Sequence, residues 1–161
     1  MKAKIGINGL GRIGRMVLRS IFEENHKNLK ISHINNRANI STACDLIKRD
    51  SIHGKFKGNV SVKSNKLIIN GNKITYSQEN NLNDISWEKY DVDIVLECTG
   101  KFNSKEKLIS HIKNGAKKVI VSAPCKNADK TIVYGVNHKN ILNKDKIISA
   151  ASCTTNCLAP V

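Results

Sequence analysis

The chain has 161 residues, of which 40% are hydrophobic and 25% are charged, so its length and composition are those of one globular domain with a buried core. No apolar run is long enough to span a membrane, and the N-terminus lacks the apolar stretch of a signal peptide, so we expect a cytoplasmic protein without a membrane partner. Lys and Arg outnumber Asp and Glu by 27 to 13, for a net charge of +14, but the lysines are scattered and few aromatic residues lie among them. This pattern favours compositional drift over a specific nucleic-acid partner.

The first part of the chain alternates between strand and helix patterns. Residues 3–8 are short, apolar and β-branched, as in a buried strand, and a glycine-rich turn follows them. From Arg12 onward apolar residues recur at helical spacing, which predicts a helix of about four turns. These residues are Ile13, Val17 and Ile21. Residues 29–35 then predict a second strand, and residues 40–48 predict a short helix.

The middle of the chain, residues 58–77, has a different pattern. Short alternating runs are interrupted there by Ser-Asn and by Asn-Gly. Asn-Gly between β-rich runs is the strongest short-range signal for a hairpin. We therefore expect an antiparallel excursion from the alternation of strand and helix.

The alternation of strand and helix resumes after the hairpins. A helix is expected over residues 104–116, with Ser104 as its N-cap and Gly115 at its end. The expected strands are residues 92–100, 117–124, 131–137 and 146–152, and a further helix is expected to begin near residue 153. Apolar strands that alternate with helical crossovers predict an α/β fold with a doubly wound, mostly parallel sheet and a β-hairpin excursion.

The turn after the first strand has the spacing G-x-G-x-x-G, formed by Gly9, Gly11 and Gly14. In dinucleotide-binding proteins the first glycine allows the tight turn, the second lets a pyrophosphate approach the backbone, and the third lets the helix pack on the sheet. The helix N-terminus then offers N–H groups to the phosphates, here beginning with Arg12 and Ile13. Because the motif stands between a strand and an amphipathic helix, it predicts a Rossmann-type domain that binds NAD or NADP.

The end of the second strand is where such a domain usually has an acid that binds the ribose hydroxyls. This sequence has Asn36 followed by Arg37 instead. Without a carboxylate the repulsion of a 2′-phosphate is absent, and Arg37 is able to pair with that phosphate. The alternative is that Asn36 bonds the ribose hydroxyls and Arg37 is solvated. The choice between NAD and NADP therefore stays open, with a slight preference for tolerance of NADP.

The five cysteines are odd in number and scattered, without a C-x-x-C pair. This pattern is typical of a reducing compartment and argues against a disulfide framework or a metal site. Cys153 differs from the others because it follows an apolar strand and opens a predicted helix, where free N–H groups favour a thiolate. Hydroxyl groups flank it at Ser152 and Thr154. We expect burial for the remaining cysteines, which are Cys44, Cys98, Cys125 and Cys157.

Six segments, taken in chain order, resemble those of one enzyme family. They are GINGLGRIGR, DSIHGKF, ECTGKF, GAKKVIVSAP, YGVN and SAASCTTNCLAPV. Over essentially all of its residues the chain resembles the N-terminal half of phosphorylating glyceraldehyde-3-phosphate dehydrogenase. The segment SCTTNCLAP is highly specific to that family and to its close relative, erythrose-4-phosphate dehydrogenase, which is an alternative.

The resemblance implies an NAD(P)-dependent aldehyde dehydrogenase that converts glyceraldehyde 3-phosphate and inorganic phosphate to 1,3-bisphosphoglycerate, in glycolysis or gluconeogenesis. It implies that Cys153 is the nucleophile and forms a thioester. Ser152 and Thr154 match positions that bind the phosphate of the substrate or the attacking phosphate. The positions that match the family's cofactor-lining residues are Thr99, Gly100 and Ser122.

The sequence departs from the family's pattern at two places, because Asn36 replaces the usual acid and Asn80 replaces an arginine near the adenine end. The family's catalytic histidine and anion-binding residues, and most of its subunit contacts, belong to a second half. We therefore expect residues 1–151 to be the NAD(P)-binding domain and residues 152–161 to begin a catalytic domain. The complete enzyme is expected to be a homotetramer, and this chain alone is expected to bind cofactor weakly and to be inactive.

A non-catalytic basic binding module on the same fold is the alternative from a different class. The net charge of +14 favours it, but an intact Ser-Cys-Thr-Thr-Asn run argues against loss of the enzyme site. An affinity for DNA or RNA that falls steeply with salt would identify such a module, and we expect no specific binding.

Overall fold

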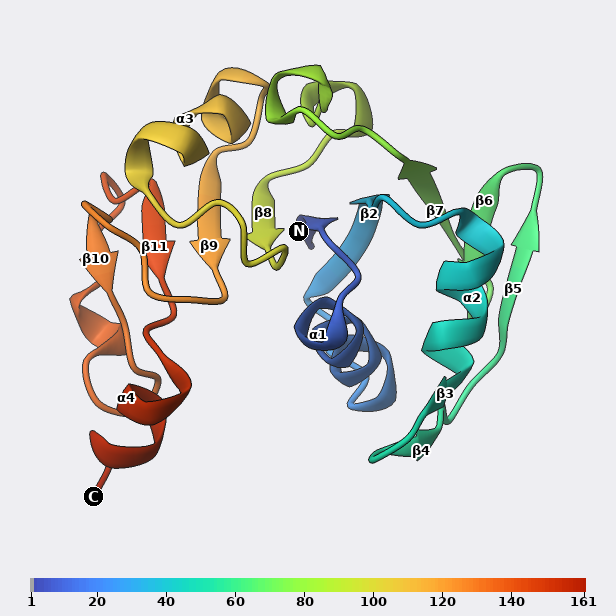
Figure 1. The fold of residues 1–161 in the computed structure, drawn as a ribbon, viewed down its shortest axis with the longest axis horizontal. Helices are drawn as coiled ribbons and strands as arrows, with labels where there is room; N and C mark the ends of the chain where they lie inside the picture. The colour runs from blue at the N-terminus through green and yellow to red at the C-terminus, as the bar shows by residue number, and fades with distance from the viewer. Residues whose placement is uncertain (1) are drawn as a thin grey trace.

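The computed structural model describes residues 2–161 (Figure 1). Within this range the strands form a nine-stranded sheet and a separate two-stranded ribbon. The strands of the large sheet are β1 (Ala3–Asn8), β2 (Leu29–Asn35), β5 (Val60–Lys63), β6 (Lys66–Ile69), β7 (Asn72–Ser77), β8 (Ile94–Glu97), β9 (Lys118–Val121), β10 (Lys130–Thr131) and β11 (Ile147–Ser149). The ribbon consists of β3 (Arg49–Asp50) and β4 (Gly54–Lys55). The helices are α1 (Arg12–Glu23), α2 (Ile40–Lys48), α3 (Lys105–Lys113) and α4 (Cys153–Leu158), with 3-10 turns at Leu82–Asp84, Glu88–Tyr90 and His138–Asn140.

The order of the strands confirms the predicted doubly wound α/β sheet. From one edge to the other the order is β10-β11-β9-β8-β1-β2-β7-β6-β5. The chain leaves β1 toward β2 on one side and later enters β8 on the other side, and both neighbours are parallel to β1. The direction of winding therefore reverses between β1 and β8, and ligands of such sheets bind at the carboxyl ends of the strands at this point.

The predicted boundaries of β2 and α2 agree with the structure, and β1 spans the predicted residues 3–8. Helix α1 is three turns long, and it packs on the sheet through Gly14 and Leu18, which are buried. The stripe predicted from the apolar spacing is less buried than expected, since Ile13 is 50% exposed. Val17 and Ile21 line an apolar groove beside α1 together with sheet residues such as Ile5 and Leu96.

The antiparallel excursion is confirmed over β5, β6 and β7. Its two turns are at Ser64-Asn65 and Asn70-Gly71, where all four residues have φ between +48° and +80°. Two central residues with positive φ match the right-handed twist of the flanking strands, which is why Asn and Gly are favoured there. The sequence did not predict that β7 would also pair in parallel with β2 and so join the hairpins to the main sheet.

The predicted strand over residues 131–137 is wrong beyond Thr131. Strand β10 ends at that residue, and the chain turns over residues 134–137. The side chain of Asn137 explains the difference, because its Oδ1 accepts the N–H of Val133 at 2.8 Å and its Nδ2 donates to the carbonyl of Thr131 at 3.1 Å. These backbone groups are therefore bonded locally instead of to a neighbouring strand.

Helix α3 lies inside the predicted range and ends before Gly115, which has φ +105°. Ser104 occupies the N-cap position as expected, but its side chain makes no capping hydrogen bond. The strands predicted over residues 92–100, 117–124 and 146–152 are present as β8, β9 and β11, each shorter than the apolar run around it.

Two apolar clusters form the core. The first packs α1, α2 and the hairpin strands against β1 and β2, and the second surrounds Trp87 between α3 and strands β8, β9 and β11. Helix α1 packs against β1 and β2, and α3 contacts β9 and β11 (Figure 1). No helix within residues 2–161 has the length and apolar content needed to cross a membrane.

Candidate cofactor-binding site

The three glycines of the turn between β1 and α1 have different surroundings. Gly9 has φ +94°, a conformation that residues with a side chain rarely adopt, and its N–H donates to the Asn35 carbonyl at 2.8 Å. A Cβ on Gly14 would lie 2.0 Å from the Gly9 carbonyl oxygen, so the helix touches the turn at this point. A Cβ on Gly11 would meet no atom within 4 Å. The middle glycine thus faces open space, as the close approach of a ligand requires.

The first turn of α1 leaves backbone donors unpaired. Among residues 2–161 the N–H groups of Arg12, Ile13 and Gly14 have no hydrogen-bond partner, and the first bond at this end runs from Arg15 to the Gly11 carbonyl. The Arg12 guanidinium lies 3.6 Å from the carboxylate of Asp50. Three free N–H groups at the positive end of the helix dipole can bind an anion such as a phosphate.

A cavity of about 420 Å³ lies at the carboxyl ends of β1, β2 and β8. It is lined by six of the predicted cofactor residues, which are Gly9, Gly11, Asn36, Arg37, Asn80 and Thr99. The structure therefore brings together the glycine turn, the end of β2, the segment after β7 and the end of β8. The predicted cofactor residues that do not line this cavity are Arg12, Ile13, Gly14, Gly100 and Ser122.

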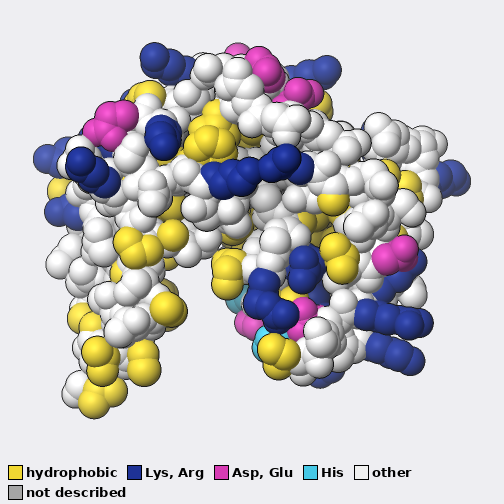
Figure 2. Space-filling model, viewed as in Figure 1, with side chains coloured by type: hydrophobic (Ala, Val, Ile, Leu, Met, Phe, Trp, Pro, Cys, Tyr) yellow, Lys and Arg dark blue, Asp and Glu magenta, His cyan; other side chains and the backbone are white. Residues whose placement is uncertain are grey.

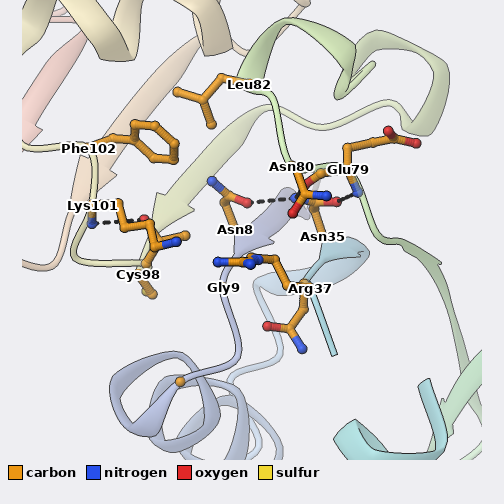
Figure 3. A pocket seen from close by; sticks show the side chains of 13 residues that line it. Asn8, Gly9, Asn35, Arg37, Glu79, Asn80, Leu82, Cys98, Lys101 and Phe102 are labelled. Atoms are coloured by element: carbon orange, nitrogen blue, oxygen red, sulfur yellow. Dashed lines mark hydrogen bonds between the residues drawn. The ribbon is translucent and has the colours of Figure 1, made fainter. Parts of the chain in front are cut away.

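Further residues of the lining were not identified from the sequence. Figure 3 shows Leu82 and Phe102 on one side of the cavity, opposite the amides of Asn8 and Asn35. The cavity thus has an apolar wall and a wall of hydrogen-bonding groups, which suits a ligand with flat rings and hydroxyls. In the sequence, Leu82 and Phe102 were marked only by their places after the hairpins and after β8.

Asn36 is held in a fixed orientation. Its Oδ1 accepts the N–H of Leu10 at 3.0 Å, and its Nδ2 donates to the hydroxyl of Tyr76, also at 3.0 Å. That hydroxyl donates in turn to the carbonyl of Ala38 at 2.7 Å, and burial raises the pKa of Tyr76. Arg37 is exposed at the rim of the cavity. Asn36 therefore places a neutral amide where such a domain usually has a carboxylate, and the exposed cation of Arg37 follows it in the chain.

Buried polar side chains join the ends of β1, β2 and β8 beside the cavity, which Asn8 and Asn35 line and Glu97 does not. Asn8, Asn35 and Glu97 are 2%, 3% and 1% exposed. Asn35 Nδ2 donates to Asn8 Oδ1 at 2.9 Å, and Asn8 Nδ2 donates to Glu97 Oε2 at 2.6 Å. Sequence reasoning did not identify these residues, although each is a polar residue at the end of an apolar strand, which is a usable signal.

The loops after β8 and β9 position the other predicted residues. Thr99 contacts the glycine turn closely, since a Cβ on Gly9 would lie 2.8 Å from its methyl group. Ser122 follows β9, and its N–H donates to the Glu97 carbonyl at 3.0 Å. Cys98 lies in the cavity wall, and burial raises its pKa to about 11, so that it stays a neutral thiol at pH 7.

The cysteine turn connects β11 to α4. Cys153 is exposed and is the first residue of α4, as expected, and Ser152 caps the helix by accepting the Thr155 N–H at 3.0 Å. The Thr154 hydroxyl lies 4.0 Å from the Cys153 Sγ. Ala151, just before the cap, is buried and has φ +60°, which is uncommon for a residue with a side chain.

The burial predicted for the other cysteines is correct for Cys44 and Cys98 and wrong for Cys157. Cys157 is exposed because α4 lies on the surface without a buried residue. Cys125 is half-buried. All five thiols are free.

Ser152 lines a second cavity, of about 580 Å³, which also contains Cys125, Lys107 and Lys126. Thr154 does not line it. Within the part of the chain that the structure describes, no histidine is hydrogen-bonded to Cys153, and no three His, Cys, Asp or Glu side chains gather in the way a metal ion would require.

The sequence was compared with known protein families and proteins. Residues 3–105 match the family model described as glyceraldehyde 3-phosphate dehydrogenase, NAD binding domain. Glyceraldehyde-3-phosphate dehydrogenase of Zymomonas mobilis is 47% identical over 162 residues, and glyceraldehyde-3-phosphate dehydrogenase 2 of Bacillus subtilis is 48% identical over 162 residues. The plasmid-encoded enzyme of Cupriavidus necator is 49% identical over 163 residues.

These three alignments cover 100% of this chain but 47–48% of each relative. The chain thus spans about half the length of the curated relatives it matches, which confirms the resemblance to an N-terminal half. The strand order, the glycine turn and the cavity at the carboxyl ends of β1 and β8 agree with an NAD-binding domain. The chain belongs to the glyceraldehyde-3-phosphate dehydrogenase family, as its NAD-binding domain.

Proposed function

We propose that the complete protein is a phosphorylating glyceraldehyde-3-phosphate dehydrogenase that uses NAD(P) and inorganic phosphate to form 1,3-bisphosphoglycerate. The observation that carries this proposal is the ligand-sized cavity lined by Gly9 and Gly11, together with the three unpaired N–H groups in the first turn of α1, which begins directly after Gly11. The names of the relatives supply glyceraldehyde 3-phosphate and its dehydrogenation, and the use of inorganic phosphate is part of our proposal. In this proposal residues 1–151 bind the cofactor, and residues 152–161 begin the catalytic domain.

The residues of the cavity fit a dinucleotide. The N–H groups of Arg12, Ile13 and Gly14 would bind its pyrophosphate, and the open space at Gly11 lets the backbone come close. The adenosine ribose would lie at Asn36, and the other half would extend toward Thr99. When bound, the cofactor supplies the acceptor for a hydride.

Cys153 is the proposed nucleophile, since it is exposed at the start of α4 beside the hydroxyls of Ser152 and Thr154. Its thiolate would attack the aldehyde carbon and form a C–S bond, and loss of a hydride from that carbon would leave a thioester. A phosphate oxygen would then attack the thioester carbon, the C–S bond would break, and the thiolate would be regenerated. We assign the accompanying proton transfer to a residue outside this chain, and phosphate binding in part to Ser152 and Thr154.

We also propose that the cofactor site tolerates NADP. Asn36 has no charge to repel a 2′-phosphate, and Arg37 is exposed at the same rim of the cavity. Calorimetric titration of the chain with NAD and with NADP tests the site and this preference together. We expect both to bind, NADP at least as tightly as NAD, and Arg37→Ala to weaken NADP roughly ten-fold while NAD changes little.

Arg49→Ala is the matched control for that titration, because Arg49 is an exposed arginine of β3 outside the cavity. It should leave both affinities unchanged. A folded chain that binds neither cofactor would contradict the assignment of the cavity, and a clear preference for NAD would assign the ribose contact to Asn36 alone.

The partners of the complete enzyme follow from the same proposal. They are glyceraldehyde 3-phosphate, inorganic phosphate and three further copies of the protein, and the five free thiols favour a reducing compartment such as the cytoplasm. The chain alone should produce no NADH from glyceraldehyde 3-phosphate and phosphate. The complete enzyme should use this aldehyde faster than erythrose 4-phosphate; the opposite order would favour the related dehydrogenase.

A further inference from the structure

We propose that Glu97 is a positioning residue of the cofactor cavity, held as a buried carboxylate that fixes Thr99 and Asn8. This inference rests on the proposed cofactor site. Glu97 ends β8, is 1% exposed and faces four hydrogen-bond donors, with no cation among them. The donors are Asn8 Nδ2, His111 Nε2, Thr99 N and Thr99 Oγ1.

The proton on His111 is determined by Trp87. The indole Nε1–H can only donate, and it lies 2.8 Å from His111 Nδ1, so this nitrogen must accept and carries no proton. The proton of the neutral ring is therefore on Nε2, which lies 3.1 Å from Glu97 Oε2. Trp87 and His111 are both fully buried. One chain of hydrogen bonds thus runs from Trp87 through His111 and ends on Glu97.

A second chain reaches Glu97 from the other side. The backbone N–H of Glu79 donates to Asn35 Oδ1 at 2.8 Å, which identifies that atom as the amide oxygen. Asn35 Nδ2 must then donate to Asn8 Oδ1, and Asn8 Nδ2 must donate to Glu97. Figure 3 shows the part of this chain that joins Asn8, Asn35 and Glu79. Both chains of hydrogen bonds begin at an N–H group, which can only donate. Each chain therefore ends with a donor that faces the Glu97 carboxylate.

An ionised carboxylate satisfies these donors, whereas an amide would not. Glutamine at this position would point its NH₂ group either at Asn8 Nδ2 and His111 Nε2 or at the two donors of Thr99. Each orientation opposes donors to donors in a buried site, which costs free energy comparable to a lost hydrogen bond. The network therefore requires the negative charge of Glu97.

The bonds to Glu97 also decide what Thr99 offers to a ligand. The N–H and the hydroxyl proton of Thr99 both point to Glu97 Oε1, and the Lys101 N–H donates to the Thr99 hydroxyl at 3.2 Å. One lone pair of the hydroxyl oxygen is left. In the cavity wall Thr99 is therefore an acceptor, suited to a ribose hydroxyl or a carboxamide N–H and unsuited to a phosphate oxygen.

A long-range nitrogen–proton correlation spectrum of the imidazole rings at pH 7 tests the network without any ligand. We expect His111 to be neutral with its proton on Nε2. A proton on Nδ1, or a doubly protonated ring, would overturn the proposal. This readout is independent of cofactor binding, so it still decides the network if the chain binds no NAD.

Calorimetric titration with NAD tests the positioning role. Glu97→Gln should weaken NAD roughly ten-fold or more and change the His111 signal. Asp129→Asn is the control, because Asp129 also accepts two backbone N–H groups and a lysine but lies outside the cavity; it should leave NAD affinity unchanged. Equal affinity of the wild type and a folded Glu97→Gln variant would overturn the role, whereas a wild type that binds no NAD would contradict the proposed cofactor site instead.

Two variants of Thr99 keep the test informative if Glu97→Gln does not fold. Thr99→Ser keeps both donors to Glu97, and Thr99→Val keeps the shape but loses the hydroxyl. We expect Thr99→Ser to bind NAD as the wild type does and Thr99→Val to bind it roughly ten-fold more weakly. The reverse order would mean that the methyl group packed against Gly9 is what matters, and would overturn the proposal.

Discussion

Two glycines of the same turn serve different purposes, and alanine at each position separates them. In Gly14→Ala the Cβ would lie 2.0 Å from a backbone oxygen, so we expect the free energy of unfolding to fall by at least ~2 kcal/mol. In Gly11→Ala the Cβ enters open space at φ −65°, so the free energy of unfolding should change by less than ~1 kcal/mol, while NAD affinity falls because the methyl group occupies the approach to the backbone. Urea unfolding and calorimetric titration measure the two effects.

The opposite result at either position would be informative. A stable Gly14→Ala chain would mean that the contact between α1 and the turn is looser than the structure shows. Unchanged NAD affinity in Gly11→Ala would place the pyrophosphate away from this glycine.

The sequence identified the glycines but not the buried polar side chains that join β1, β2 and β8 beside the cavity. Glycine has backbone freedom and smallness that no other residue shares, so a spacing of three glycines is informative by itself. Asn8, Asn35 and Glu97 are common residue types, and their meaning depends on which strands are neighbours. That adjacency follows from the reversal of strand order between β1 and β8, which no local pattern encodes.

Strand β2 contains a histidine whose ionisation is linked to the stability of the sheet. His33 is fully buried, stacks on Tyr90 with ring centroids 3.7 Å apart, and is hydrogen-bonded to the hydroxyls of Thr75 and Ser77 on β7. Burial, and to a smaller extent the positive charge of Lys89, lower its pKa from 6.5 to about 4. The folded chain therefore holds this ring neutral where the unfolded chain protonates it.

The sign of the resulting pH dependence follows directly. Between pH 6.5 and about 4 the unfolded chain binds one more proton at this site, so His33 makes stability fall as pH falls through that window. We expect His33 to account for about 2.5 kcal/mol of the difference in unfolding free energy between pH 7 and pH 4.5. Urea unfolding at both pH values should show a smaller difference for His33→Gln than for the wild type. His53→Gln is the control, since His53 is exposed, and an equal difference in all three chains would refute the linkage.

Prediction of elements from the sequence succeeded where local chemistry decides the structure. The Ser-Asn and Asn-Gly turns at residues 64–65 and 70–71 impose their geometry within two residues. The run over residues 131–137 has the apolar content of a strand, but the side chain of Asn137 bonds the backbone there and prevents pairing. The Asn137 amide competes with a neighbouring strand for the backbone groups of Thr131 and Val133. It can do so only because the turn brings it back to Val133, which the sequence pattern does not show.

At the scale of the whole molecule, the reactivity of the five thiols reports which parts of the fold exclude solvent. Two are exposed in α4, one is half-buried and two are in the core. An aromatic disulfide reagent releases one coloured thiolate for each cysteine that reacts with it. In the folded chain we expect two cysteines to react fast and Cys125 to react more slowly, because burial raises its pKa. The two buried cysteines should react only after denaturation. Cys153→Ser and Cys157→Ser should each remove one fast equivalent, and Cys98→Ser should remove none. Fast reaction of Cys98 would mean that the cavity wall is open.

On the face drawn in Figure 2 the positive charge is spread rather than gathered. Figure 2 shows Lys and Arg side chains in several separate places on one face, with acidic side chains between some of them. Before the start of β8, Asp91 pairs with Lys4 of β1, and Asp93 pairs with Lys117 at 2.6 Å. The composition therefore gives the high net charge, but only the structure shows where on the surface the charges lie and which of them are paired.

The hydrogen bonds of Asn36 restrict how cofactor preference can change during evolution. A carboxylate at this position would still accept the Leu10 N–H, but it would also require the single hydroxyl proton of Tyr76, which is now given to the Ala38 carbonyl. A descendant that replaced Asn36 by an acid would leave that carbonyl without its partner unless the loop or residue 76 changed as well. We therefore expect a change from Asn36 to an acid to need a second substitution, because the first change alone leaves a backbone group unpaired.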